Sequence, residues 1–229
     1  MSPVPLVAVL TALCVPASAA PKFTALEKVR AWPVYDQRAS GEIDLLELCR
    51  LARLPCAAVA QKGETFAAPE GPIAGLTVGA LLDRILAAHP GHEATMSEGV
   101  LSVRRPGDAC AAALERPAKK ARYPVRSARV AALMVLGASG WPALAKAGLS
   151  SLTGDAEDAR YQAVDVMIHD GASVRRTLDA IAQGDGRMLW RAESDGKGCV
   201  GFHFRNWRAP QPIERGSVLV SVSGPKKNP

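Results

Sequence analysis

Apolar residues recur at helical spacing in two widely separated segments of the chain. One segment begins at Val78 and the other at Val174, and both follow the pattern V-x-x-x-L-D-x-I. Side chains at positions i, i+4 and i+7 lie on one face of a helix. The pattern therefore predicts two amphipathic helices that bury the same valine–leucine–isoleucine face.

Each of these helices stands in the same order of elements. A strand-like segment precedes each helix, at residues 73–77 and 163–168. A pair of strand-like runs joined by turn-forming residues follows each helix. These runs are residues 92–96 and 100–103 in the first half, and 187–192 and 199–205 in the second. The repeated β-α-β-β order predicts an α+β fold of two small related modules, each with helices packed on a small sheet. The alternative is one irregular α+β domain with a coincidental match.

Two further helices are expected upstream of these cores, at residues 43–54 and 130–139. Each ends just before a proline, Pro55 and Pro142 respectively, because proline disfavours helix at the residue before it. The first module is expected over residues 24–105 and the second over 127–223, followed by a tail at 224–229.

The segment between the modules, residues 106–126, is rich in Lys and Arg and interrupted by prolines. This composition predicts a solvated linker. The alternative is a contact site for an anionic lipid surface or an acidic partner. Its cationic residues would be Arg116, Lys119, Lys120 and Arg122.

The N-terminal residues 1–20 form an apolar run that ends in small residues. This pattern is typical of a secretory signal peptide and predicts a periplasmic or secreted protein. Residues 130–147 are also apolar, but Gly137, Gly140 and Pro142 interrupt them. We therefore expect a core helix and a turn there, and no transmembrane span after signal cleavage.

Four cysteines remain once Cys14 leaves with the signal peptide, and an even number in an exported chain permits two disulfides. Pro55 ends the helix that carries Cys49, so Cys56 can turn back to pair with it. Cys110 and Cys199 would then join the middle of the chain to its C-terminal half. Buried free thiols are the alternative.

Charge and composition narrow the classes of partner. The 229 residues carry a net charge of +6, which suits an acidic partner. Aromatic residues make up only 5% of the chain, which argues against a stacking surface for nucleic acid.

No recognisable catalytic, metal or cofactor motif occurs in the sequence. His89 and His92 flank Pro90-Gly91 and are interpreted as turn residues rather than metal ligands. Cys199 and His203 are too far apart along a strand to act as nucleophile and base. Asp83 and Asp179 recur in the repeat as helix-face residues. We therefore predict a protein that is not an enzyme and has no cofactor.

The C-terminal residues 216–224 are β-prone and uncharged. Two roles are open for this segment. It completes the sheet of the second module, or it is an exposed strand that pairs with the sheet edge of a partner.

Residues 29–105 resemble the secretin and TonB short N-terminal domain. The resemblance lies in Ile73-Ala-Gly-Leu-Thr-Val78, in Leu81-Leu-Asp-Arg-Ile-Leu86 and in Gly99-Val-Leu-Ser-Val103. The second half shares only its V-x-x-x-L-D-x-I positions and is more divergent. Because these are core-packing motifs, the resemblance implies a fold and a periplasmic protein–protein contact module, not a particular partner.

The expected function is therefore an exported, non-enzymatic interaction or adaptor module of the bacterial cell envelope, with an envelope protein as its partner. The alternative is a soluble periplasmic protein that binds a small ligand in the cleft between the two modules.

Overall fold

The structure is a computed structural model that describes residues 44–66, 76–150, 160–206 and 216–225. The predicted signal peptide, residues 73–75 of the strand expected at 73–77 and most of the tail lie outside these residues. Helices and strands are interspersed along the chain, and the strands form two mixed sheets. The predicted α+β class is therefore confirmed.

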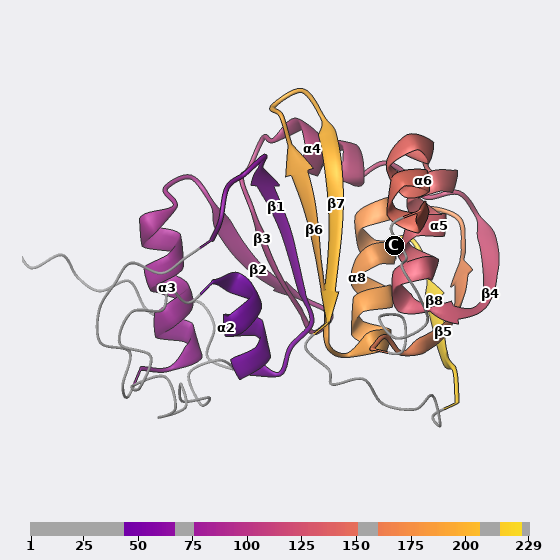
Figure 1. Ribbon diagram of the computed structural model, residues 1–229, viewed down its shortest axis with the longest axis horizontal. Coiled ribbons are helices and arrows are strands. Elements are labelled where there is room, and N and C mark those ends of the chain that lie inside the picture. The colour runs from indigo at the N-terminus through magenta and orange to yellow at the C-terminus, as the bar shows by residue number, and fades with distance from the viewer. Residues whose placement is uncertain (1–43, 67–75, 151–159, 207–215, 226–229) are drawn as a thin grey trace, which may run out of the picture.

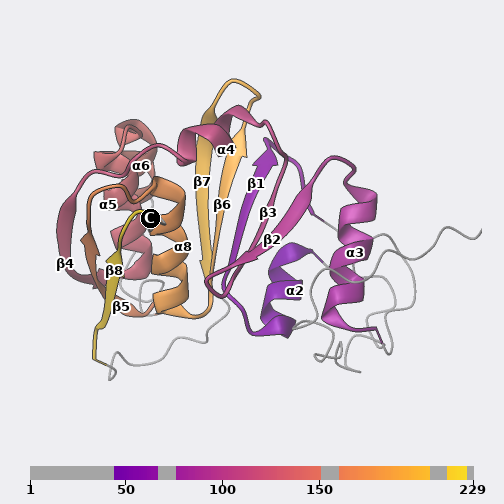
Figure 2. The same ribbon diagram turned by 180° about the vertical axis from the view of Figure 1, so that it is seen from behind.

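Four layers follow one another across the molecule (Figure 1). Helices α2 (Leu45–Ala52) and α3 (Val78–Ala88) cover one face of a five-stranded sheet. Helix α8 (Val174–Asp185) lies on the opposite face of that sheet, with α5 (Ala128–Ala138) and α6 (Pro142–Ser150) beside it. A three-stranded sheet closes the far side, and Figure 2 shows α8 between the two sheets from behind.

The five-stranded sheet combines strands from both halves of the chain, in the order β2-β3-β1-β6-β7. Strand β1 runs parallel to both β3 and β6, and each of these is half of an antiparallel hairpin. The strands are β1 (Cys56–Gln61), β2 (Glu93–Ser97), β3 (Val100–Arg104), β6 (Met188–Ser194) and β7 (Cys199–Asn206).

The central strand β1 is buried on both faces. Ala57 and Val59 belong to the core shared with α8, whereas Cys56, Ala58 and Ala60 belong to the core under α2 and α3. A strand covered on both sides has a continuous apolar sequence without alternation. Such a short run carries little periodic signal, and the sequence analysis did not include this strand.

The three-stranded sheet has the order β4-β5-β8. Strand β5 occupies the predicted range and alternates between buried and partly exposed residues. It pairs antiparallel with β4 and parallel with β8, so the C-terminal segment does pair with a second sheet. The strands are β4 (Ala121–Ser127), β5 (Ala163–Ile168) and β8 (Val218–Val222).

The two repeat helices form where their spacing predicts them. Thr77 caps α3 by accepting a hydrogen bond from the N–H of Ala80, and Ser173 caps α8 in the same way through Arg176. The predicted valine, leucine and isoleucine of each helix are buried. However, α3 and α8 bury these faces in different cores, on opposite sides of the five-stranded sheet.

The prediction that each half packs on a small sheet of its own is not confirmed. The hairpin β6–β7 follows α8 in the chain but pairs with β1 of the first half. Strand β5, which precedes α8, pairs instead with β4 and β8. The alternation of side chains along β6 explains why this hairpin joins the sheet of the first half. Leu189 of β6 contacts the core under α2 and α3, while Trp190 and Ala192 contact the core around α8. One hairpin thereby fills two cores.

The segment expected to be a solvated linker differs from that prediction. It contains α4 (Ala109–Leu114), which Asp108 caps, and most of β4. Cys110, Leu114 and Tyr123 are buried, because apolar residues spaced between the charged ones face the core. The region 130–147 forms α5 and most of α6, and none of the described helices is long and apolar enough to cross a membrane.

Both expected cysteine pairs are disulfides in the structure. Cys49 of α2 is joined to Cys56 of β1, with Cα atoms 6.2 Å apart. Arg53 ends α2 in a left-handed conformation before Pro55, which brings Cys56 back against the helix. Cys110 of α4 is joined to Cys199 of β7 across 89 positions of sequence. The second disulfide therefore connects the two halves covalently.

Candidate functional site

A half-open cavity of about 220 Å³ lies on the face of the five-stranded sheet next to the N-terminal end of α2. The first half of the chain contributes the start of α2, strand β1 and the loop after β1. The second half contributes one face of the hairpin β6–β7. The cavity therefore forms because the hairpin of the second half pairs with β1 of the first half.

Strand register places polar side chains from both strands of the hairpin on the cavity. On β6, Leu189, Arg191 and Glu193 are two residues apart and so share a face. Arg191 is paired with His203 on β7, and Leu189 with Arg205. The polar face is thus continuous over both strands of the hairpin.

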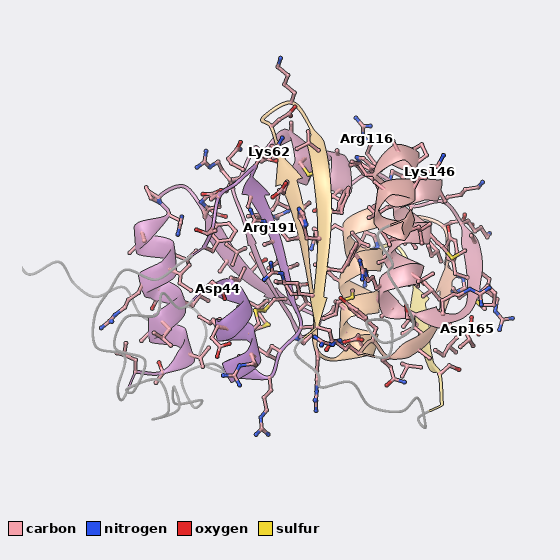
Figure 3. The ribbon with its side chains drawn as sticks, in the orientation of Figure 1. Asp44, Lys62, Arg116, Lys146, Asp165 and Arg191 are labelled. Carbon is pink, nitrogen blue, oxygen red and sulfur yellow. A yellow bond between two sulfur atoms is a disulfide. The ribbon has the colours of Figure 1, made fainter. Side chains whose placement is uncertain are left out.

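Arg191 is a partly buried charged residue of this face (Figure 3). One guanidinium nitrogen, Nη2, donates to the carbonyl oxygen of Glu64 and lies 3.5 Å from Oε1 of Glu193. The Nε–H group is buried and has no hydrogen-bond acceptor in the described part of the chain. A buried donor without an acceptor costs free energy, so this Nε–H group lowers the stability of the arrangement around Arg191.

Glu193 is held between Arg191 and His203. Its carboxylate approaches Arg191 on one side, and its Oε2 lies 3.4 Å from Nε2 of His203 on the other. Gly201 stands opposite Glu193, and a Cβ atom there would lie 3.1 Å from Oε2. A glycine at this position leaves room for the carboxylate over the neighbouring strand.

Arg205 lies at the open side of the cavity. Its side chain is exposed, and its guanidinium makes no hydrogen bond or ion pair with any residue that the structure describes. The cavity therefore contains one held arginine and one unengaged arginine on adjacent strands.

Most of the remaining cavity wall is apolar, and Asp44 and Thr65 are its polar members. Phe66, Leu45, Leu189 and Ala58 are each less than 10% exposed. The N–H of Leu45 donates to the carbonyl of Phe66 over 2.9 Å, which fixes the ring next to the start of α2. An apolar wall beside two arginines suits an amphipathic ligand.

The histidines of the His-Pro-Gly-His turn lie behind this wall rather than in it. Their rings contact the ring of Phe66 edge-on, and Glu64 approaches both, with Oε1 3.6 Å from His89 and Oε2 3.5 Å from His92. Within the described ranges, no group of three such side chains has the geometry to hold a metal ion. The cluster therefore positions Phe66 and the loop that binds Arg191.

The two aspartates of the repeat have different surroundings. Asp83 is exposed on α3, whereas Asp179 is buried between α8 and the five-stranded sheet. Burial raises the pKa of Asp179 to about 6, against the opposing effects of Arg175 and the indole of Trp190. The two carboxylates lie on opposite sides of the sheet and do not form an acid–base pair.

The structure separates the other predicted residues from the cavity. Cys199 is in a disulfide, so its thiol does not meet His203. Of the basic residues proposed to contact an anionic surface, Lys120 and Arg122 form ion pairs with exposed Asp170 and with Asp165. Arg116 and Lys119 make no such pair in the described part of the chain. An anionic surface as partner stays a prediction.

The sequence analysis missed the cavity residues Arg191 and Arg205. The available signal was the alternation Leu189, Arg191, Glu193, which places charged residues on the same face as a buried leucine. Alternation alone does not tell whether such a face meets solvent or a cavity, because that depends on the strand next to it.

Comparison with protein-family models, with curated proteins and with solved structures found no match to this chain. The resemblance of residues 29–105 to the secretin and TonB short N-terminal domain therefore stays an expectation from the sequence. The functional conclusions rest on the geometry of this molecule.

Proposed function

We propose that this protein is an exported, non-enzymatic protein-interaction or adaptor module of the bacterial cell envelope, related to the secretin and TonB short N-terminal domain. The observation that carries the proposal is the outer edge of β8, which is built to accept a further strand. Two disulfides support the export part of the proposal, because such bonds persist in oxidising compartments.

Strand β8 has an open edge in the described part of the chain, where β5 is its only strand partner. The carbonyl of Val222 accepts a hydrogen bond from the N–H of His169, so the backbone groups of Val222 point toward β5. Groups of alternate residues point to opposite sides of a strand. The N–H and C=O groups of Leu219 and Ser221 therefore point to the open edge.

The other edge strands carry features that discourage pairing. Strand β4 contains Pro124 and two arginines, and its pairing with β5 shifts register between Tyr123 and Arg126. Strand β2 is short with a charged first residue, and β7 carries Arg205 near its end. Strand β8 has neither charge nor proline, and Leu219 is 65% exposed. Unprotected edges of this kind are where an extended segment of a partner adds a strand.

The variant Ser221→Pro tests the proposal. It removes the backbone N–H group of residue 221, which points to the open edge, and leaves the backbone hydrogen bonds between β8 and β5 in place. A photo-crosslinking residue at position 219 of the full chain, expressed in a bacterial envelope, should give discrete crosslinked proteins. Ser221→Pro should abolish these products, and the matched control Ser221→Thr should retain them. Crosslinking that is absent, or unchanged by Ser221→Pro, would contradict the proposal.

A second candidate function is that of a soluble periplasmic protein that binds a small ligand between the two halves. The observation that favours it is the cavity lined by α2, β1 and the hairpin β6–β7. This function uses a different face of the molecule from β8, so the two candidates can be tested independently.

A further inference from the structure

We propose that the cavity beside α2 binds a carboxylate that carries a compact apolar group, with the carboxylate placed between Arg191 and Arg205. The inference deepens the second candidate function and rests on it. It is independent of strand addition at β8.

The two arginines are arranged to share one anionic group. Arg191 and Arg205 are diagonal neighbours on the hairpin, since Arg191 pairs with His203 and Arg205 pairs with Leu189. Diagonal neighbours have Cβ atoms roughly 7 to 8 Å apart, which long side chains span easily. Guanidinium groups bind carboxylates through two parallel hydrogen bonds, so one carboxylate can engage both side chains.

Each arginine has donors that the described residues leave unused. Nε of Arg191 is buried without an acceptor, although Nη2 of the same group is bound to the carbonyl of Glu64. The guanidinium of Arg205 has no partner at all in the described ranges. The donors of Arg205 are therefore the ones that a bound carboxylate can reach directly, with the guanidinium of Arg191 beside them.

The carboxylates that line the cavity are already engaged. Glu193 lies between Arg191 and His203, on the side of Arg191 that is away from Arg205 in the register. Asp44 is the N-cap of α2, and its Oδ1 accepts a hydrogen bond of 2.8 Å from the N–H of Glu47. In the register, Arg191 and Arg205 are therefore adjacent cations with no carboxylate between them.

The apolar wall determines what the carboxylate must carry. Phe66, Leu45 and Leu189 lie beside the arginines and leave about 220 Å³ of space. This volume is smaller than an ordinary drug-sized pocket, so it suits one compact hydrophobic group. An acid with a phenyl or branched alkyl group meets both requirements, and so does the C-terminal residue of a peptide.

Titration calorimetry on the full, disulfide-bonded chain tests this inference with four probes. They are N-acetyl-L-phenylalanine, its uncharged amide, inorganic phosphate and the peptide N-acetyl-Gly-Gly-Phe with a free C-terminus. We expect the two carboxylates to bind at least about tenfold more tightly than the amide, because the amide cannot form charge-assisted bonds. Phosphate should bind more weakly than either acid, because it leaves the apolar wall empty.

Arg205→Gln is the decisive variant, because this exposed side chain supports no other described contact. It should weaken binding of both carboxylates about tenfold or more, whereas Arg116→Gln, a similarly unpaired arginine elsewhere, should leave binding unchanged. The inference is overturned if the amide or phosphate binds as tightly as the acids, or if Arg205→Gln has no effect. It is equally overturned if no carboxylate binds at about 10 mM.

The same titrations separate the two sources of the carboxylate. Tighter binding of N-acetyl-L-phenylalanine indicates a free small acid, and tighter binding of the tripeptide indicates a peptide C-terminus; either result supports the carboxylate site. Crosslinking at position 219 does not involve the cavity. A failure of the carboxylate site therefore leaves the β8 proposal intact, and the reverse also holds.

Discussion

The indole Nε1–H of Trp190 donates a hydrogen bond of 3.0 Å to Oδ1 of Asp179 in the layer between α8 and the five-stranded sheet. The other carboxylate oxygen, Oδ2, accepts from Arg175, which also contacts Glu115 after α4. This group of side chains joins α8 to strand β6 and to the segment that leads into β4. It is a buried polar contact in the core around α8, and it has a consequence for stability.

We predict that Asp179 lowers stability as the pH rises from 4 to 7. Its pKa in the folded protein is about 6, above the ordinary value of 3.8, chiefly because burial disfavours the charged form. The folded state therefore holds a proton in this range that the unfolded state releases, so stability falls as the carboxylate ionises. Relative to Asp179→Asn, the wild-type free energy of unfolding should fall by about 2 kcal/mol over this range.

Urea denaturation of both proteins at several pH values measures this difference. Comparison with the variant cancels the contributions of the other carboxylates, which the two proteins share. Asp83→Asn, which replaces the exposed counterpart in the repeat, is the control for exchanging a carboxyl for an amide on a helix of the same pattern. Parallel curves for wild type and Asp179→Asn would show that the buried carboxylate titrates normally.

We predict that Gly184→Ala loosens strand β8. An added Cβ atom at this position of α8 would lie 2.7 Å from Cγ2 of Val220, a buried residue of β8. The overlap should cost about 1 to 3 kcal/mol, partly offset by the better helix propensity of alanine. Amide hydrogen exchange in β8 should speed up more than in β1. Gly198→Ala, which meets no atom within 4 Å, is the control and should leave exchange unchanged.

We predict that the two disulfides contribute unequally to stability. The bond between Cys110 and Cys199 spans 89 positions, and that between Cys49 and Cys56 spans 7. Loop-closure entropy gives about 4 to 5 kcal/mol for the long loop and about 2 kcal/mol for the short one. Paired Cys→Ala variants, compared by chemical denaturation, should show this order. Equal losses would indicate that packing at the cysteines outweighs chain entropy.

We predict similar losses from removing the equivalent caps of the two repeat helices. The hydroxyl of Thr77 accepts from Ala80 over 3.1 Å, and the hydroxyl of Ser173 accepts from Arg176 over 3.2 Å. Each substitution to alanine should cost about 1 kcal/mol in the free energy of unfolding. Replacing Thr77 by serine keeps the oxygen acceptor and should restore most of the loss. If Thr77→Ala alone were neutral, the two caps would not be equivalent.

Local features of the chain were predicted well because their signals are local. The spacing of Val174, Leu178 and Ile181 identifies α8, and the alternation over 163–168 identifies β5 with its observed bounds. Pro55 placed the end of α2 and so the pairing of Cys49 with Cys56. Strand β1 was missed, because burial on both faces removes the alternation that marks a strand.

The cavity could not be predicted from the same signals. Arg191 and Arg205 are ordinary strand residues until β6 lies beside β1 and brings the loop carrying Glu64 and Phe66 within reach. No local sequence pattern specifies that β6 pairs with β1. The basic segment between the halves was mispredicted for the same reason. Its charges suggest a solvated linker, but Leu114 and Tyr123 are buried in a core that exists only in the assembled fold.

By itself, the sequence determined the two repeat helices, strand β5, which helix faces are apolar and which cysteines lie close enough to pair along the chain. These properties follow from periodicity, from proline and from caps a few residues away. Tertiary structure alone decided that the second hairpin joins β1 rather than β5, because backbone ladders are chemically alike wherever strands meet. Side-chain packing on both faces of β6 selects between them, and that selection forms both the shared sheet and the cavity.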